Sequence, residues 1–493
     1  MAERPNLLLI MTDQQRGDAL GCAGNPHIHT PYLDALAASG IRFERAYTES
    51  PECVPARALL LSGQWGHRTG VLGNGQSLSP EAPTFVHRLG QVGYRTQAIG
   101  KMHFKPIRAS HGFDRLELSE EIPWGSWEGD DYLTFLRRSG YGHVDEPYGI
   151  RHEYYYHPQV SQLPVELHGT TWTAERAIDF ILHAPSDPWF LCVSFVKPHP
   201  PFDPAIPFLT LYDPEQLPLP IRSDGPEGWE LARAQTYSKW MESTDDNLAR
   251  LIKAAYYACI TQIDEQIGRI MRALSGSGAR SSTLVLFTSD HGELMGDHRH
   301  FGKRSFWEGG AGIPLLASWP GHLPEGAVHP GLVGLRDIST TLTQAAGAGS
   351  FGVGTDLVGL ARGEIAARDV TFGELYEGHN ALYFAADQRW KYVFAPNGAR
   401  QALYDIETDP GELVDRADDP TAAPHRNRLR GALLRFFQED GYRAALSPDA
   451  SDLLELPPGE IHWGRNRQYS PRRKQSEFNP ARTRNGLGPE RMP

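Results

Sequence analysis

A cysteine, a proline and an arginine stand at alternate positions near the start of the chain, as Cys53, Pro55 and Arg57. Proline suits the first turn of a helix, and the arginine would project a fixed cation one turn from the cysteine. A helix N-terminus also favours anions through its free N–H groups and its dipole. The spacing therefore predicts a reactive group beside an anion-binding helix end. The alternative is a buried structural thiol, the usual fate of a lone cysteine.

Two apolar runs end in polar side chains that could do chemistry. The first run of the chain ends in Asp13 and Gln14 and predicts a fully buried parallel strand. Open α/β sheets place ligands at the C-terminal ends of such strands. Residues 96–103 repeat the pattern with Lys101 and His103, which lie on one face if the strand continues. Both runs therefore predict functional side chains at one edge of a sheet.

Two later apolar runs lead into further candidates. The third run, residues 189–196, is followed by His199 in a proline-rich segment. The fourth ends just before Asp290 and His291, and Lys303 follows shortly after. Each fragment alone is a weak signal, because an aspartate at a strand end more often caps a helix and a lysine is usually solvated. All four segments occur in one chain and in one order. A shared functional site is therefore a better interpretation than four chance patterns.

Taken together, these segments resemble those of the sulfatase family in the alkaline phosphatase superfamily. In that family the cysteine is oxidised after translation to formylglycine, an aldehyde whose hydrate attacks a sulfate ester. The resemblance implies an alkaline-phosphatase-like α/β/α sandwich with a small C-terminal α+β subdomain, made of an antiparallel sheet and a helix. The segment from Leu403 to Glu412 matches a phrase of that subdomain, so the resemblance extends to about residue 440.

The resemblance also implies roles for the individual residues. One divalent metal ion would be held by Asp13, Gln14, Asp290, His291 and the formylglycine formed from Cys53. Arg57 would hold that side chain, and Lys101 and Lys303 would clamp the sulfuryl oxygens. His199 would donate a proton to the leaving oxygen. His103 would take a proton from the second hydroxyl of the hydrated formylglycine, so that sulfate is released and the aldehyde forms again.

Several positions depart from the commonest pattern of the family. Ala56 replaces a serine and Gln64 an arginine, but the modifying enzyme reads chiefly the cysteine, proline and arginine, so conversion is still expected. Gln14 stands where many sulfatases have aspartate, and His291 where many have asparagine. These changes move the metal preference from Ca²⁺ toward Mn²⁺, and both ions stay open. Asn74 lies where some relatives place a donor to a substrate oxygen.

The Asp-Gln and Asp-His pairs resemble a subgroup that contains choline sulfatases and phosphonate monoester hydrolases. Lys101 and His103 are the residues that sulfatases have at these positions, whereas phosphonate hydrolases have others. This favours hydrolysis of a sulfate monoester with a small organic, aryl or carbohydrate alcohol. A phosphonate monoester hydrolase or phosphodiesterase is the alternative, and a non-catalytic anion-binding protein is a remote one. A transient partner would be the formylglycine-generating enzyme.

Strand-like runs alternate with helical patterns from residue 6 to about 345, which predicts a parallel sheet covered on both faces. Helices are expected over residues 30–39, 171–183, 247–274 and around 332–346. Short strands are expected at 370–372, 381–384 and 390–393, followed by a helix from about 426 to 440. The predicted parts are a catalytic domain, a C-terminal antiparallel-sheet subdomain and a basic extended tail, at residues 1–350, 360–445 and 457–493.

Two long irregular segments, 110–165 and 198–229, are predicted to wall the substrate pocket. The tail is too polar to form a core, and it is either a flexible arm or an arm that joins subunits in a homo-oligomer. With 48 basic and 60 acidic residues the formal net charge is −12, which argues against nucleic acid as a partner.

The composition also bears on the compartment. No apolar run reaches the roughly 20 residues that span a bilayer, so no membrane partner is expected. The chain goes straight into its first strand, which predicts that there is no signal peptide. Four scattered cysteines are too few for a disulfide framework. A reducing, cytoplasmic location is therefore expected.

Overall fold

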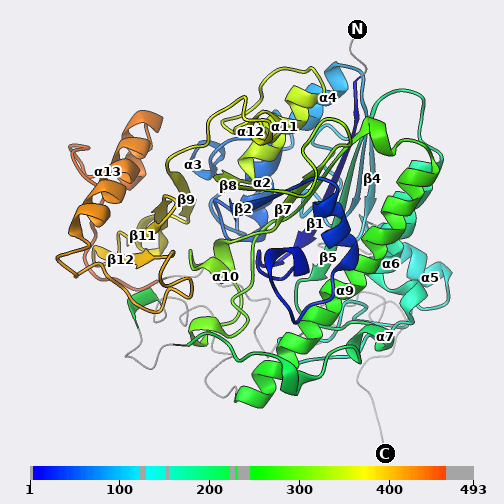
Figure 1. The fold of residues 1–493 in the computed structure, drawn as a ribbon, viewed down its shortest axis with the longest axis horizontal. Coiled ribbons are helices and arrows are strands. Elements are labelled where there is room, and N and C mark those ends of the chain that lie inside the picture. Colours follow the sequence, from blue (N-terminus) through cyan, green and yellow to red (C-terminus); the bar gives the residue numbers. More distant parts are fainter. Residues whose placement is uncertain (1–3, 122–128, 152–154, 223–227, 231–244, 462–493) are drawn as a thin grey trace, which may run out of the picture.

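A sheet of eight strands forms the centre of the protein (Figure 1). The computed structural model describes residues 4–121, 129–151, 155–222, 228–230 and 245–461. In the sheet, β1 (Asn6–Asp13) lies between β5 (Trp189–Pro198) and β6 (Thr283–Ser289), and all three are parallel. Nearly every residue of these strands is buried, because helices cover both faces of the sheet. This burial explains why the strands appear in the sequence as continuous apolar runs.

The complete strand order is β4-β3-β5-β1-β6-β7-β2-β8. The other five strands are β2 (Ile41–Tyr47), β3 (Arg95–Gly100), β4 (Arg115–Leu118), β7 (Leu315–Ser318) and β8 (Ala327–Gly334). All neighbouring strands are parallel except β7, which runs antiparallel to both β6 and β2. The expected sheet is wholly parallel, and β7 differs because the chain re-enters the sheet at the edge where β6 ends.

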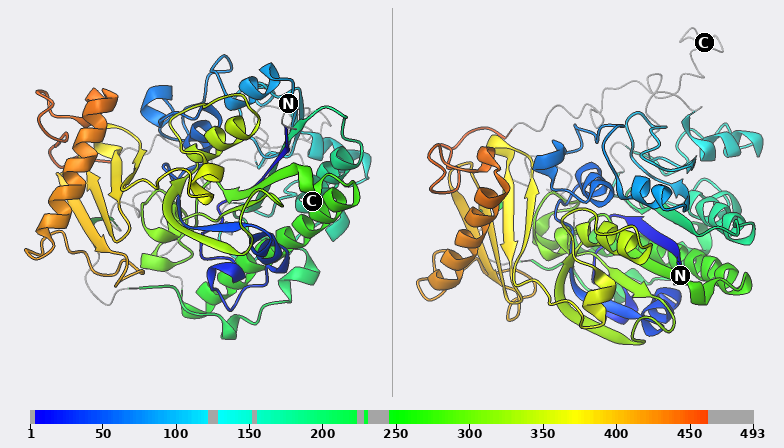
Figure 2. Two further views of the ribbon diagram at one scale, coloured as in Figure 1. Left: turned by 45° about the horizontal axis from the view of Figure 1, so that its top comes forward. Right: turned by 90° about the horizontal axis from the view of Figure 1, so that it is seen from above.

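Helices pack on both faces of this sheet (Figures 1 and 2). One face is covered by α1 (Pro31–Ala38), α6 (Gly169–Leu182) and α9 (Asp246–Gly276). The other is covered by α2 (Cys53–Ser62), α4 (Phe85–Gln91), α11 (Arg336–Ala345) and α12 (Leu357–Ala361). Four further helices are α3 (Gly66–Thr69), α5 (Asp131–Arg138), α7 (Ile206–Leu209) and α10 (Glu308–Ala311). The predicted α/β/α sandwich is confirmed.

Two predicted elements have other bounds than expected. The helix expected around residues 332–346 begins only after β8, because Val333 is buried in that strand beside β2. The strand before Lys101 and His103 stops at Gly100, whose φ of +97° belongs to the left-handed region. A Cβ atom there would lie 2.0 Å from a backbone oxygen of β5, so only glycine fits. Lys101 and His103 therefore do not share a strand face.

A second sheet of four antiparallel strands follows, in the order β12-β11-β10-β9. Its elements are β9 (Thr371–Leu375), β10 (Leu382–Ala386), β11 (Trp390–Ala395), β12 (Arg400–Asp405) and α13 (Ala423–Asp440). The helix covers the outer face of this sheet, and the inner face lies toward the large sheet (Figure 2). The strands and the helix expected in this region are confirmed, with β12 in addition.

Residues 347–359 come after α11 and before β9 in the sequence. A domain boundary at this point, with domains over residues 1–350 and 360–445, stays a prediction. The tail predicted over residues 457–493 lies outside the described residues from residue 462 onward, so a role in oligomer formation also stays a prediction. Among the described residues, the helices are too short or too polar to span a membrane.

A buried lysine joins the small sheet to α10 and the residues just before it. Lys391 on β11 is 0% exposed, and its Nζ lies 2.5 Å from Glu308 Oε1, 2.9 Å from Glu412 Oε1 and 2.8 Å from the carbonyl oxygen of Phe306. Lys391→Met would leave Glu412 buried without its cation. We expect this change to lower the free energy of unfolding by about 3–5 kcal/mol in urea titration.

The control is Arg362→Met, which removes a half-buried cation whose Nη1 lies 3.9 Å from Glu364. Partly exposed ion pairs of this kind contribute little to stability. The free energy of unfolding should therefore change by less than about 0.5 kcal/mol. Equal stability of the Lys391→Met variant and the wild type would show that Lys391 does not stabilise the contact between the two sheets.

Candidate active site

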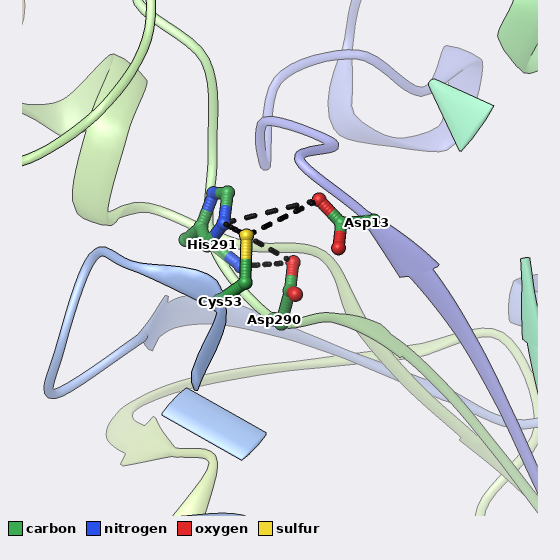
Figure 3. A group of neighbouring side chains, drawn as sticks. All are labelled: Asp13, Cys53, Asp290 and His291. Carbon is green, nitrogen blue, oxygen red and sulfur yellow. Dashed lines mark hydrogen bonds and ion pairs between the residues drawn. The ribbon is translucent and has the colours of Figure 1, made fainter. Parts of the chain in front are cut away.

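Four predicted site residues converge where β1 and β6 end and α2 begins (Figure 3). Asp13 is the last residue of β1, Cys53 is the first residue of α2, and Asp290 and His291 directly follow β6. All four side chains are buried, and one ligand atom of each lies within 4.8 Å of the others. They meet because β1 and β6 are parallel neighbours whose carboxyl ends lie at one edge of the sheet.

The imidazole of His291 is oriented as in a metal site. Its Nδ1 lies 3.0 Å from the carbonyl oxygen of Gly292, which makes Nδ1 the protonated nitrogen. The lone pair of Nε2 then faces Cys53 Sγ at 3.2 Å, Asp290 Oδ1 at 3.6 Å and Asp13 Oδ1 at 3.9 Å. A backbone carbonyl that accepts from Nδ1 and so fixes the tautomer is typical of metal-binding histidines.

Arg57 bridges the two carboxylates from the far side. It lies one turn along α2 from Cys53 and is 5% exposed. Its Nε donates to Asp290 Oδ2 at 2.9 Å and its Nη2 to Asp13 Oδ2 at 3.1 Å. Its Nη1 donates to the carbonyl oxygen of Lys101 at 2.6 Å and to Ser194 Oγ at 3.0 Å. The guanidinium therefore fixes both carboxylates and leaves Oδ1 of Asp13 on the side of Cys53.

Gln14 presents its amide oxygen to the same space. Its φ is +71°, a conformation that glutamine rarely adopts and that marks functional sites. Its Nε2 donates to the carboxylate of Glu293, and its Oε1 accepts from Lys303 Nζ at 2.7 Å. The donor set of carboxylates, an amide oxygen and an imidazole nitrogen, next to position 53, fits one divalent cation.

Lys303 and Lys101 supply positive charge to the site. Lys303 Nζ lies 3.0 Å from Cys53 Sγ, and Lys101 Nζ lies 2.7 Å from Asp13 Oδ2. Burial would raise the pKa of Asp13, but the cations around it outweigh burial and hold that pKa well below its usual range. Burial and Asp13 also oppose ionisation of Cys53, yet the ammonium groups of Lys303 and Lys101 bring its pKa well below the usual thiol value. The site is therefore built to stabilise negative charge at position 53.

His199 and His103 are held differently. His199 is buried just beyond β5, and its Nδ1 lies 2.7 Å from the carbonyl oxygen of Pro200. Burial lowers its pKa to about 4. His103 has a φ of +63° and is held by hydrogen bonds from its backbone N–H to both oxygens of Glu120, at 2.9 and 3.1 Å. Its Nδ1 is buried and has no hydrogen-bond partner among the described residues.

Asn74 caps the helix that carries Cys53. Its Oδ1 accepts from the backbone N–H of Val54 at 2.9 Å, and its own N–H donates to Glu52 Oε2 at 2.8 Å. Lys105 Nζ donates to the backbone carbonyl oxygen of Asn74 at 3.2 Å. The oxygen end of the amide is therefore engaged by the protein, so a substrate contact would be made by Nδ2. That contact stays a prediction.

Sequence reasoning missed the carboxylates that orient the predicted residues. Glu121 binds Lys101 and lies beside His199, Glu120 holds the backbone of His103, and Glu293 orients Gln14. Glu293 stands in the polar segment after β6 and could have been found there. Glu120 and Glu121 follow the short strand β4 in a segment without a regular pattern, so no local signal pointed to them.

Comparisons with known proteins agree with this site. Residues 5–348 match the family model of sulfatases, and residues 296–439 match the C-terminal model of N-sulphoglucosamine sulphohydrolase. The chain is 32% identical over 482 residues to an arylsulfatase of Clostridium perfringens, covering 89% of this chain and 96% of that enzyme. It is 30% identical over 443 residues to a choline-sulfatase of Rhizobium meliloti, covering 85% of this chain and 83% of that enzyme.

The crystal structure of a phosphonate monoester hydrolase of Agrobacterium radiobacter is also similar. It aligns with a TM-score of 0.75 at 26% identity, over 90% of this chain and 99% of that one. The fold and the site therefore define a member of the alkaline phosphatase superfamily. Within it, the chain belongs to the sulfatase family and is a sulfuric ester hydrolase.

Proposed function

We propose that the protein hydrolyses a sulfate monoester of a small organic, aryl or carbohydrate alcohol, with formylglycine formed from Cys53 and one bound divalent metal ion. The observation that carries this proposal is the surroundings of Cys53 Sγ. Lys303 Nζ lies 3.0 Å away, and His291 Nε2 lies 3.2 Å away. A nucleophile at this position would meet both the metal ligands and a cation for the sulfuryl group.

The proposed metal ligands are Asp13, Gln14, Asp290, His291 and the modified residue 53. When bound, the ion would act as a Lewis acid and would lower the pKa of a coordinated hydroxyl. Ca²⁺ suits the oxygen donors and Mn²⁺ suits the set with an imidazole, so both are proposed.

Formylglycine would supply a hydrated aldehyde as the nucleophile. Cys53 is 1% exposed in the folded protein, so a formylglycine-generating enzyme would have to act before folding is complete. Peptide mass spectrometry across Cys53 tests this step, since a CH₂SH side chain and an aldehyde differ in mass. An unmodified thiol in active protein would contradict the proposed nucleophile.

All four cysteines are unpaired, which supports a reducing compartment such as the cytoplasm.

The protein side chains would bind the ester and move its protons. Lys101 and Lys303 would bind the sulfuryl oxygens, and Arg57 would hold the carboxylates in place. His199 would donate a proton to the leaving oxygen from Nε2, because Nδ1 is engaged by the carbonyl oxygen of Pro200. His103, whose buried Nδ1 has no partner among the described residues, would accept a proton in the second half of the reaction.

The alternative substrate is a phosphonate monoester or a phosphodiester. A sulfate monoester offers three unsubstituted oxygens to the cations of the site. A phosphorus ester replaces one of them with a substituted atom, which would leave a buried cation without an acceptor. We therefore expect kcat/KM for 4-nitrophenyl sulfate to exceed that for a matched 4-nitrophenyl phosphonate by about tenfold or more, or about 1.4 kcal/mol.

The comparison needs the same preparation for both substrates, with its metal content measured. The Cys53→Ala variant serves as the control, because an activity that survives this change does not come from the proposed site. A higher kcat/KM for the phosphorus ester would make the phosphonate hydrolase the better assignment.

A further inference from the structure

Glu121 contacts three positively charged or titratable groups in and beside the site, although the sequence predicts no role for it. Its side chain is 8% exposed. Oε2 lies 2.7 Å from Lys101 Nζ, and Oε1 lies 2.7 Å from Arg151 Nη1 and 3.4 Å from His199 Nδ1. Arg151 also donates from Nη2 to the carbonyl oxygen of Glu121 at 3.1 Å. The carboxylate therefore links a proposed sulfuryl-binding lysine to the proposed acid.

This geometry determines which protonation state of His199 can donate a proton to the substrate. Nδ1 faces two acceptors, the carbonyl oxygen of Pro200 at 2.7 Å and Oε1 of Glu121 at 3.4 Å, so it keeps its proton. In the neutral ring Nε2 then has no proton to give. Only the imidazolium form carries a proton on Nε2, so the acid step requires a positively charged His199.

The charges around His199 act in opposite directions. Burial is the largest influence and lowers its pKa, and Lys303 and Lys101 lower it further. Glu121 and Asp13 raise it, and Glu121 is the larger of the two. Arg151 lies against Glu121 and offsets part of that charge. The ring of Tyr155, whose centre lies 6.2 Å from that of His199, adds no charge.

We propose that Glu121 is a positioning residue for the acid step of this hydrolase. It orients His199 through Nδ1 and stabilises the imidazolium whose Nε2 proton goes to the leaving oxygen. As the nucleophile at position 53 forms its bond to sulfur, the S–O bond to the alcohol breaks and its electron pair stays on the alcohol oxygen. The Nε2 proton neutralises that oxygen, and His199 returns to the neutral form. This inference rests on the proposed function. The competing explanation is that Glu121 only neutralises the buried Lys101.

The test compares Glu121→Gln with the wild type on two sulfate esters. Phenyl sulfate has a poor leaving group that needs the proton, whereas 4-nitrophenyl sulfate has a good one that needs it less. General acid catalysis contributes about 10²–10⁴-fold, so we expect kcat/KM for phenyl sulfate to fall by on the order of 10²-fold. The loss for 4-nitrophenyl sulfate should be about tenfold at most.

The pH profile gives a second readout that a structural role would not change. Loss of the negative charge lowers the pKa of His199, so the alkaline limb of kcat for phenyl sulfate should move to lower pH in Glu121→Gln. Arg151→Gln removes the opposing charge and should move that limb to higher pH. Glu121→Asp keeps the charge and should restore part of the phenyl sulfate activity. Glu117→Gln, a change to the carboxylate that binds Gln97 on the neighbouring strand, is the matched control.

Equal losses on both esters, with an unmoved alkaline limb, would overturn the inference and leave Glu121 as a partner of Lys101 alone. If the wild type with formylglycine and metal hydrolyses no sulfate ester, the proposed function fails instead. The role of Glu121 is then decided by NMR titration of ¹³C-labelled histidine with inorganic sulfate present, the His199 signal being assigned by its loss in His199→Gln. A lower pKa in Glu121→Gln supports the inference, and an unchanged one overturns it.

Discussion

Cys53→Ala is expected to reduce kcat/KM for sulfate esters by on the order of 10⁴-fold or more, because the variant lacks the precursor of the nucleophile. The same change removes one proposed metal ligand. Only one buried atom is lost from a side chain at the start of α2, so the fold should persist with a loss of about 1–2 kcal/mol in stability. The measurement is kcat/KM with 4-nitrophenyl sulfate, together with the melting temperature.

Cys192→Ala is the matched control. Cys192 is also buried, lies on β5 and packs in the core on the face that α2 covers. Burial raises the pKa of its thiol to about 12, so it is an inert side chain. This variant should keep wild-type kcat/KM while losing similar stability. Full activity of Cys53→Ala would rule out an aldehyde at position 53 as the nucleophile.

The site could be predicted where its residues stand at the ends of long parallel strands. Asp13, Asp290 and His291 follow apolar runs that are buried on both faces, and such runs are visible in the sequence. Parallel pairing then brings their ends to one edge of the sheet, as the register of β1 with β6 shows. The convergence of these side chains therefore follows from local patterns and one topological rule.

Glu121 could not be predicted in this way. It contacts Lys101 because the chain after β4 runs beside the end of β3, where the N–H of Ser119 donates to the carbonyl oxygen of Gly100 at 3.1 Å. The strand β4 has only four residues and an exposed first position, so its periodicity is too short to detect. The position of Glu121 depends on an edge pairing that has no local signal.

Two features of the backbone could not be predicted from the sequence pattern either: the left-handed residues of the site and the direction of β7. The left-handed φ angles of Gln14 and His103 occur at residue types that rarely adopt them, and tertiary contacts hold them. In His103, two hydrogen bonds from the backbone N–H to Glu120 fix the turn. The antiparallel β7 is a similar case, because a run of three apolar residues and a serine can form a strand but does not show its direction.

Asp13→Asn is expected to remove most of the bound metal and to lower kcat/KM by on the order of 10³-fold or more. Asp13 Oδ2 lies 2.7 Å from Lys101 Nζ and 3.1 Å from Arg57 Nη2, and Lys303 is a third cation at the site. A divalent ion adds further positive charge, so its affinity depends on the two carboxylates. Metal content per chain, measured by atomic emission on the purified variant, tests this expectation.

The same substitution should also destabilise the fold, by about 3–5 kcal/mol, because Lys101 and Arg57 stay buried with one carboxylate fewer. Asp264→Asn separates that effect from metal loss. Asp264 is equally buried on α9 and accepts from the backbone N–H groups of Tyr32 at 3.1 Å and Leu33 at 2.7 Å, at the start of α1. Its variant should lose stability but keep one metal ion per chain and wild-type activity in the folded protein. Metal loss in both variants would attribute the effect to destabilisation, whereas a full equivalent of metal in Asp13→Asn would exclude Asp13 as a required ligand.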